Sequence, residues 1–296
     1  IYLIFGMLSA IANVNKKFAE EFVIENMEMI RKMIMKKNLF ELSDALSTIA
    51  DEAPAFAELC VEIFIEEINN VIKNKINNST VYDIFALIHA FDLIHRSFAV
   101  SLLKRFKEVI KEKIKNSELD EIGAALFGVT PHFLKKCFED RKVLRYAIYG
   151  YVDFDFIGNT IIKEVGNAIK EASRRKIPKS DPNKIELFLF TLAEIFSEDG
   201  FYKEILAENF NTIKEIIRHM SLLDALVFIR RFIEPFAEMT RYLLLMKFKA
   251  EWNKIRRMLD ENKISEVNSL LDEISWINKD VIICLLYTSP SPRDRG

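Results

Sequence analysis

The chain has 296 residues, half of them apolar, and a formal net charge of −2 from 42 basic and 44 acidic side chains. That balance lacks the positive footprint of a nucleic-acid-binding protein and disfavours a nucleic-acid partner. It contains 24 phenylalanines but only 8 glycines and 7 prolines, too few for the many tight turns of a β protein. Composition therefore favours an all-helical protein with a large core.

An apolar pattern with helical spacing recurs along the chain. Positions +3, +4 and +7 from each start are apolar in nearly every unit. The seven starts are Ile4, Leu42, Val81, Leu119, Ile185, Leu222 and Val267, at intervals of 38, 39, 38, 66, 37 and 45 residues. Position +14 is phenylalanine at Phe18, Phe56, Phe133 and Phe236. The pattern predicts an all-α fold, a right-handed α-solenoid of about seven antiparallel helix pairs with a period of about 38 residues.

Each unit contains two helices of different character. The first, as in VYDIFALIHAF from Val81, is apolar nearly all round and must be covered on several sides by its partner and by neighbouring units. The second, as in residues 56–76, is apolar on one face only and is predicted to be an outer helix. An acid at position +2 fits the first turn of a helix better than a metal site, because free N–H groups lie there. These acids are Asp44, Asp83, Glu121 and Asp224, with capping boxes expected at Ser117–Asp120 and Ser221–Asp224.

The pattern fails between Leu119 and Ile185. This interval holds an aromatic run, a helical stretch at about residues 157–174 and the basic segment RRKIPKSDP. The long interval after Leu222 predicts an extended second helix at residues 236–259. The predicted domains are an N-terminal array with a truncated start at 1–150, a degenerate unit and linker at 151–180, a C-terminal array at 181–283 and a tail at 284–296.

The two ends of the chain have unusual sequences. Residues 284–294 read CLLYTSPSPRD and resemble an in-frame translation of a sequencing-library adapter, so we expect this tail to be non-native. The chain opens on Ile1 inside the apolar pattern of a first helix, which predicts a fragment. Outside the tail the cysteines are Cys60 and Cys137, too few for a disulfide framework and suited to the reducing cytoplasm. The longest apolar run, residues 1–12, is shorter than the roughly 20 residues that a membrane helix needs, so no membrane association is expected.

No catalytic, cofactor or metal motif is present in the sequence. Phosphate-binding loops, dinucleotide-binding glycines and the nucleophile elbow are missing. His89 and His95 are six residues apart and do not share a helical face, so they do not form a zinc motif. Asp153 and Asp155 lie where a helix is expected to begin, and we interpret them as caps. We therefore predict no enzyme activity, no cofactor and no metal.

Two positions of the first helices, +8 and +11, vary between units while the core positions do not. Such positions are either unconstrained surface or a recognition face, since first helices in stacked arrays line the concave side. They show no regular code of the kind that RNA-reading repeats use. The candidate partner-binding face consists of Ala50, His89, Asp92, Phe127, Thr130 and Arg230.

The chain resembles the α-solenoid class of HEAT, armadillo and tetratricopeptide repeats over residues 1–283. Through its Ser/Asn-capped first helices and the sequence Pro54 to Glu58, it is similar to divergent microbial helical repeats that lie C-terminal to a signalling or defence NTPase. The resemblance implies a binding role. We predict a non-catalytic scaffold that binds a protein or peptide partner in the cytoplasm. Two alternatives stay open: the sensor or regulatory region of a larger NTPase or nuclease, and an RNA-binding helical repeat.

Overall fold

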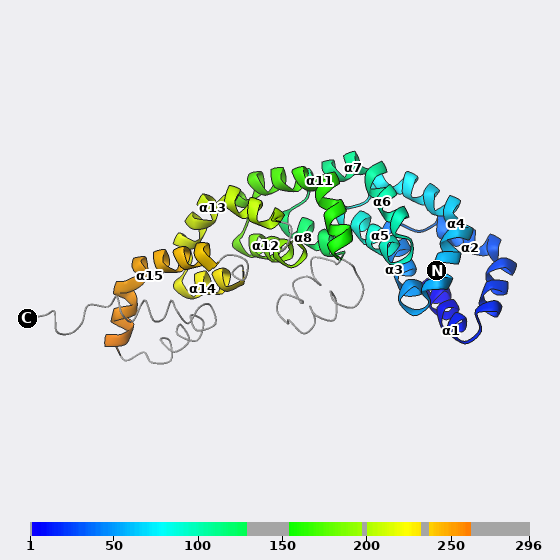
Figure 1. Ribbon diagram of the computed structural model, residues 1–296, viewed down its shortest axis with the longest axis horizontal. Coiled ribbons are helices and arrows are strands. Elements are labelled where there is room, and N and C mark those ends of the chain that lie inside the picture. Colours follow the sequence, from blue (N-terminus) through cyan, green and yellow to red (C-terminus); the bar gives the residue numbers. More distant parts are fainter. Residues whose placement is uncertain (1, 129–153, 197–199, 232–236, 262–296) are drawn as a thin grey trace, which may run out of the picture. The chain divides into compact units, whose positions relative to one another are not determined.

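The computed structural model describes residues 2–128, 154–196, 200–231 and 237–261 (Figure 1). Within these ranges the chain forms thirteen α-helices and two short 3-10 helices and has no β-strand, which confirms the all-α prediction. The contacts divide the chain into two compact units, unit 1 (Ile1–Ile205) and unit 2 (Leu206–Gly296). The division falls inside helix α13 (Phe201–His219), and the domain boundaries expected from the sequence stay a prediction.

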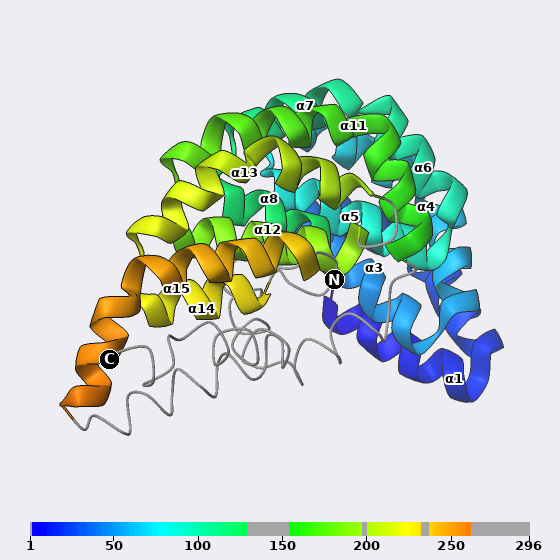
Figure 2. The same ribbon diagram turned by 60° about the vertical axis from the view of Figure 1, so that its left-hand side comes forward.

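Unit 1 consists of two layers of helices. Helices α1, α3, α5, α8 and α12 contact one another in this order, and α4, α6, α7 and α11 run along the other side of this row (Figures 1 and 2). The elements of unit 1 are α1 (Tyr2–Glu25), α2 (Met27–Met35), α3 (Leu39–Glu52), α4 (Pro54–Lys75), η1 (Ile76–Asn78), α5 (Val81–Ile94), α6 (Arg96–Arg105), α7 (Lys107–Asn116), α8 (Leu119–Phe127), α11 (Phe154–Lys176), η2 (Ile177–Lys179) and α12 (Pro182–Phe196).

The first layer contains the core. Every residue of α5 from Ile84 to Asp92 is buried, as is every residue of α12 from Ile185 to Leu192. A helix that is buried all round needs neighbours on several sides, and α5 has α3, α6 and α8 around it. In α4, by contrast, exposed residues such as Glu58 and Glu62 alternate with buried ones. In α5, α12 and α4 the burial thus follows the apolar patterns of the sequence.

Three successive units have nearly the same backbone dihedral angles at two bends, which we call corners. The corner after the first helix has φ/ψ of −149°/85° at Asn15, −144°/71° at Ala53 and −148°/83° at His95. Eleven residues later the second helix breaks, with φ/ψ of −106°/15° at Asn26, −108°/18° at Phe64 and −107°/13° at Phe106. Both corners recur after 38 and then 42 residues. The three segments are therefore copies of one structural unit.

A capping box or a single side-chain cap stands at the start of four first helices. Asp224 donates its backbone N–H to Ser221 Oγ at 3.1 Å, and Glu121 accepts from the backbone N–H of Glu118 at 2.8 Å. At α5 the box joins Thr80 and Asp83. These boxes satisfy N–H groups that a helix leaves without a partner in its first turn. Three of the four predicted acids, Asp83, Glu121 and Asp224, thus lie where they were expected.

The predicted role of Asp44 is wrong, and the predicted box Ser117–Asp120 is one residue early. Helix α3 begins at Leu39, three residues before the predicted start, and its capping box joins Asn38 and Glu41 at 2.8 Å. A shift of three residues is almost one helical turn, so it leaves the apolar stripe on the same face. Apolar spacing alone therefore does not reveal such a shift.

The irregular interval after Leu119 contains α11, which includes the predicted helical stretch at 157–174. Helix α11 packs against α7, α8 and α12, the place that a second helix takes in the unit that begins with α8. The extra length of this unit thus lies in residues 129–153, which are outside the described residues.

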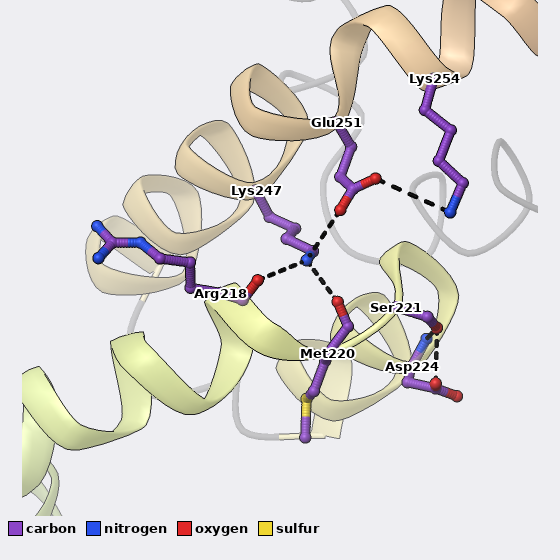
Figure 3. A network of polar contacts seen from close by, with 7 residues as sticks. All are labelled: Arg218, Met220, Ser221, Asp224, Lys247, Glu251 and Lys254. Atoms are coloured by element: carbon purple, nitrogen blue, oxygen red, sulfur yellow. Dashed lines mark hydrogen bonds and ion pairs between the residues drawn. The ribbon is translucent and has the colours of Figure 1, made fainter.

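Unit 2 contains the rest of α13, α14 (Leu222–Arg231) and α15 (Ala237–Asp260). Helix α15 packs against α14 and agrees with the long helix predicted at 236–259. Its Lys247 is buried and donates to the backbone carbonyls of Arg218, at 3.0 Å, and Met220 (Figure 3). Glu251, one turn further along α15, lies 3.2 Å from the same ammonium group. This lysine therefore holds the C-terminal end of α13 against α15.

A lysine in unit 1 makes the same pair of hydrogen bonds. Lys113 of α7 donates to the backbone carbonyls of Asn77, at 2.9 Å, and Ser79. In both units one acceptor precedes the cap of the following first helix by three residues and the other precedes it by one residue. This cap is Thr80 in unit 1 and Ser221 in unit 2. The carbonyls at a helix C-terminus lack partners within the helix and carry partial negative charge, so an ammonium group stabilises them.

Candidate interaction surface

The structure places the predicted partner-binding residues mainly in the interior. Ala50, His89 and Phe127 are each 5% exposed and Asp92 is 7% exposed. Thr130 lies outside the described residues, and of Arg230 in α14 only the backbone is described. The four buried side chains do not form an open surface in this structure, and their role in binding stays a prediction.

His89 is part of the packed core between α5 and α8. Its Nε2–H donates to the carbonyl of Leu126 at 3.0 Å. A Cβ placed on the neighbouring Gly128 would lie 2.6 Å from His89 Cδ2, and Gly128 has a φ of +68° that favours glycine. Burial lowers the pKa of His89 to about 4, because the charged imidazolium loses its hydration. The neutral ring therefore joins α5 to the end of α8.

Because His89 is buried in its neutral form, we predict that the free energy of unfolding depends on pH. The unfolded chain binds a proton at His89 below a pH of about 6.5, whereas the folded chain does so only near pH 4. The contribution of His89 to the free energy of unfolding is therefore fully present above pH 6.5 and decreases as the pH falls towards 4. Between pH 6.5 and pH 5, protonation of this group lowers the free energy of unfolding by about 2 kcal/mol. Urea unfolding at both pH values should show a smaller loss in His89→Gln than in the parent. Equal losses would contradict this role.

No group of three or more His, Cys, Asp or Glu side chains within the described ranges could hold a metal ion. Burial raises the pKa of the Cys60 thiol to about 12, so this cysteine is not a thiolate nucleophile near neutral pH. Of the helices that the structure describes, none combines the length and the hydropathy needed to cross a bilayer.

Among the surface hollows of unit 1, two are lined by described residues of its helices. One, of about 480 Å³, lies at the starts of α5 and α8, where the carboxylates of Asp83 and Glu121 already accept from the backbone of their own helices. The other, of about 310 Å³, lies between α7 and α11. Its Lys111 and Arg175 are paired with acids on their own helices, Glu108 and Glu171. Neither hollow assembles the groups of a catalytic or ligand site.

An exposed apolar surface lies on α1. We define the α1 stripe as Leu3, Met7, Ala10 and Val14, which are spaced by four, three and four residues and so share one helical face. Leu3 is 77%, Met7 64% and Val14 89% exposed, and Ala10 is also exposed. The opposite side of α1, including Phe5, Leu8 and Ser9, is buried. Among the described helices, the row that starts with α1 continues only through α3.

The sequence did not single out the α1 stripe. Residues 1–12 are almost uniformly apolar, so spacing does not separate the residues that α3 covers from those that remain open. A comparison of α1 with the first helices of the other units could have identified it. The residues at the open face of α1 are apolar, which is typical of an interaction site.

In comparisons with known proteins, no family model, no curated protein and no solved structure matches the chain.

Proposed function

We propose that the chain is a non-catalytic helical scaffold that mediates protein–protein interaction through the open face of α1. The observation that carries this proposal is the α1 stripe, whose three large side chains are more than half exposed. Burying such side chains stabilises a complex by about 1.5–3 kcal/mol each. Contiguous exposed apolar surface marks an interaction site more often than scattered exposed residues do.

The proposed architecture of this scaffold is a right-handed α-solenoid of about seven helix pairs. The corners repeated at Asn15, Ala53 and His95 support it, because equal corners stack equal units in register. The unbroken row of contacts from α1 through α3, α5 and α8 to α12 supports it as well. In such an array each unit contacts only its neighbours, and among the described helices the row reaches α1 through α3.

A protein or peptide suits this surface better than a nucleic acid. The stripe contains no basic side chain, and the nearby Lys16 and Lys17 lie within 3.7 and 3.8 Å of Glu20 and Glu21. Phosphate recognition needs positive charge that is not already neutralised. An apolar stripe instead gains free energy when another apolar surface displaces water from it.

The proposal is tested by affinity capture followed by mass spectrometry with the double variant Met7→Glu/Val14→Glu. Because both side chains are exposed, the variant should melt like the parent, yet it should lose a defined set of captured proteins. The control is Ile24→Glu, which changes a side chain that is 61% exposed on the part of α1 beyond the Asn15 corner. If parent, variant and control captured the same proteins, binding would not use the α1 stripe and the proposal would fail.

A further inference from the structure

We infer that the outer side of α6, α7 and α11 is a second interaction surface, which binds an acidic segment of another protein. We call it the basic face and define it by Lys104, Arg105, Lys107, Lys115, Lys163 and Arg175. All of these residues belong to unit 1, and none belongs to the α1 stripe. The basic face therefore goes beyond the proposed function, which concerns α1 alone.

Charge is distributed unevenly between the two layers of unit 1. In the first layer, α3, α5, α8 and α12 together carry ten acidic side chains and one basic side chain. In the second layer, α6 and α7 together carry seven basic and two acidic side chains, and α11 carries five basic and three acidic ones. Helix α4 of the same layer carries four glutamates and two lysines, so a place in this layer does not require positive charge. The small net charge of the whole chain thus conceals a positive surface.

The fold brings together two basic stretches that are far apart in the sequence. Helix α11 lies along α6 and α7 (Figures 1 and 2). Near the start of α7, Lys107 lies 3.9 Å from Glu164 of α11. At the other end of α7, Lys115 lines the same hollow as Arg175. From Lys163 to Arg175 the basic face extends along α11 by about 18 Å, at 1.5 Å for each residue.

The glutamates of this surface already have partners. Glu108 pairs with Lys111 at 2.8 Å, Glu164 with Lys107 at 3.9 Å and Glu171 with Arg175. By contrast, Lys104, Lys115 and Lys163 are exposed and have no acidic partner among the residues that the structure describes. This surplus of cations attracts a negatively charged partner.

The stability of the helices does not account for these cations. Lys107 is the first residue of α7 and follows Lys104 and Arg105 at the end of α6. The N-terminus of a helix carries partial positive charge, so a cation in the first turn of α7 is unfavourable. Lys163 lies in the interior of α11, away from the last turn where a basic side chain would stabilise the helix. Only Lys115, in the last turn of α7, has such a local role.

An acidic protein segment fits the basic face better than a nucleic acid does. Of the aromatic side chains described on α6, α7 and α11, none is exposed, whereas proteins that bind single strands stack bases on aromatic rings. Glu108, Glu164 and Glu171 also lie among the cations and repel phosphates, which follow one another at every nucleotide. A protein segment can place a neutral or basic side chain opposite each glutamate.

The test measures binding of a fluorescein-labelled peptide of about twelve residues, half glutamate and half alanine, which as a helix matches the length of the basic face. Fluorescence anisotropy is recorded with the full chain at about 0.15 M salt, where distant charges are largely screened. The variant Lys104→Glu/Lys115→Glu/Lys163→Glu should weaken binding by about tenfold or more, because it reverses the unpaired cations. The corresponding triple Lys→Gln variant should show a smaller loss, and it keeps the test valid if the charge-reversed chain does not fold.

The control is Lys36→Glu/Lys73→Glu/Lys249→Glu, which changes the net charge equally at exposed lysines outside the basic face. It should bind the peptide within about twofold of the parent. Equal losses in both triple variants, or no binding of the peptide by the parent, would overturn the inference. So would a twelve-nucleotide uridine RNA that binds more tightly than the peptide and depends on the same three lysines, since the partner would then be a nucleic acid. None of these variants changes α1, so a failure here is distinct from a failure of the proposed function.

Discussion

Phe56→Ala should lower the free energy of unfolding by about 3–5 kcal/mol, the largest effect that we expect from a single substitution. Phe56 is 1% exposed and stands in the first turn of α4, three residues after the corner at Ala53. Removing its ring leaves a cavity that the rigid corner and Pro54 keep from collapsing. Urea unfolding followed by circular dichroism measures the change.

The matched control is Phe18→Ala, the same substitution at the same position of the preceding unit. Because Phe18 is 51% exposed, we expect a loss below about 1 kcal/mol. If Phe56→Ala had the same free energy of unfolding as the parent, Phe56 would not belong to the core. If both variants lost the same free energy of unfolding, the open face of α1 would be covered. Phe133, which the sequence placed at the equivalent position, lies outside the described residues.

Lys247→Met should cost about 2–3 kcal/mol, since hydrogen bonds to a charged group contribute more than neutral ones and the freed carbonyls stay partly buried. The substitution keeps the aliphatic length of the side chain but removes the ammonium group that binds the carbonyls of Arg218 and Met220 (Figure 3). It also leaves Glu251, which is 24% exposed, without its closer partner. Thermal unfolding measures the loss, and amide hydrogen exchange should show it first at the end of α13.

The control for this prediction is Lys254→Met on the same helix. Lys254 is 65% exposed and lies 4.0 Å from Glu251, so its removal should change stability by less than about 0.5 kcal/mol. Lys113→Met should have an intermediate effect, since Lys113 makes the same two carbonyl contacts but is only partly buried. If Lys247→Met and Lys254→Met changed the stability equally little, Lys247 would not hold the end of α13.

The helical pattern predicted the elements well but misplaced one boundary. Counting from Leu42 put the start of α3 one turn late, so position +14 found Phe56 but missed Phe98, which follows the corner at His95. The structure shows that Phe98 packs edge-on against Phe91, with ring centroids 4.6 Å apart. Backbone dihedrals, rather than apolar spacing, reveal that Phe18, Phe56 and Phe98 are equivalent.

The candidate site was predicted less well than the fold. The sequence selected His89 and Asp92 because they vary between units, yet both are buried in α5. Variation at a position shows only that no single residue type is required there. Whether a side chain meets solvent depends on what packs over it, and that comes from helices far away in the sequence.

By itself, the sequence determined the all-helical class, the buried character of α5 and α12, the one-sided burial of α4 and most of the caps. These properties depend on residues within one or two helical turns, where spacing and side-chain chemistry act directly. Only the tertiary structure decided that Lys113 and Lys247 hold the ends of preceding helices and that the α1 stripe is open. Burial is set by neighbours that are distant along the chain, so equivalent residues such as Phe18 and Phe56 have opposite environments although their local sequences predict the same role.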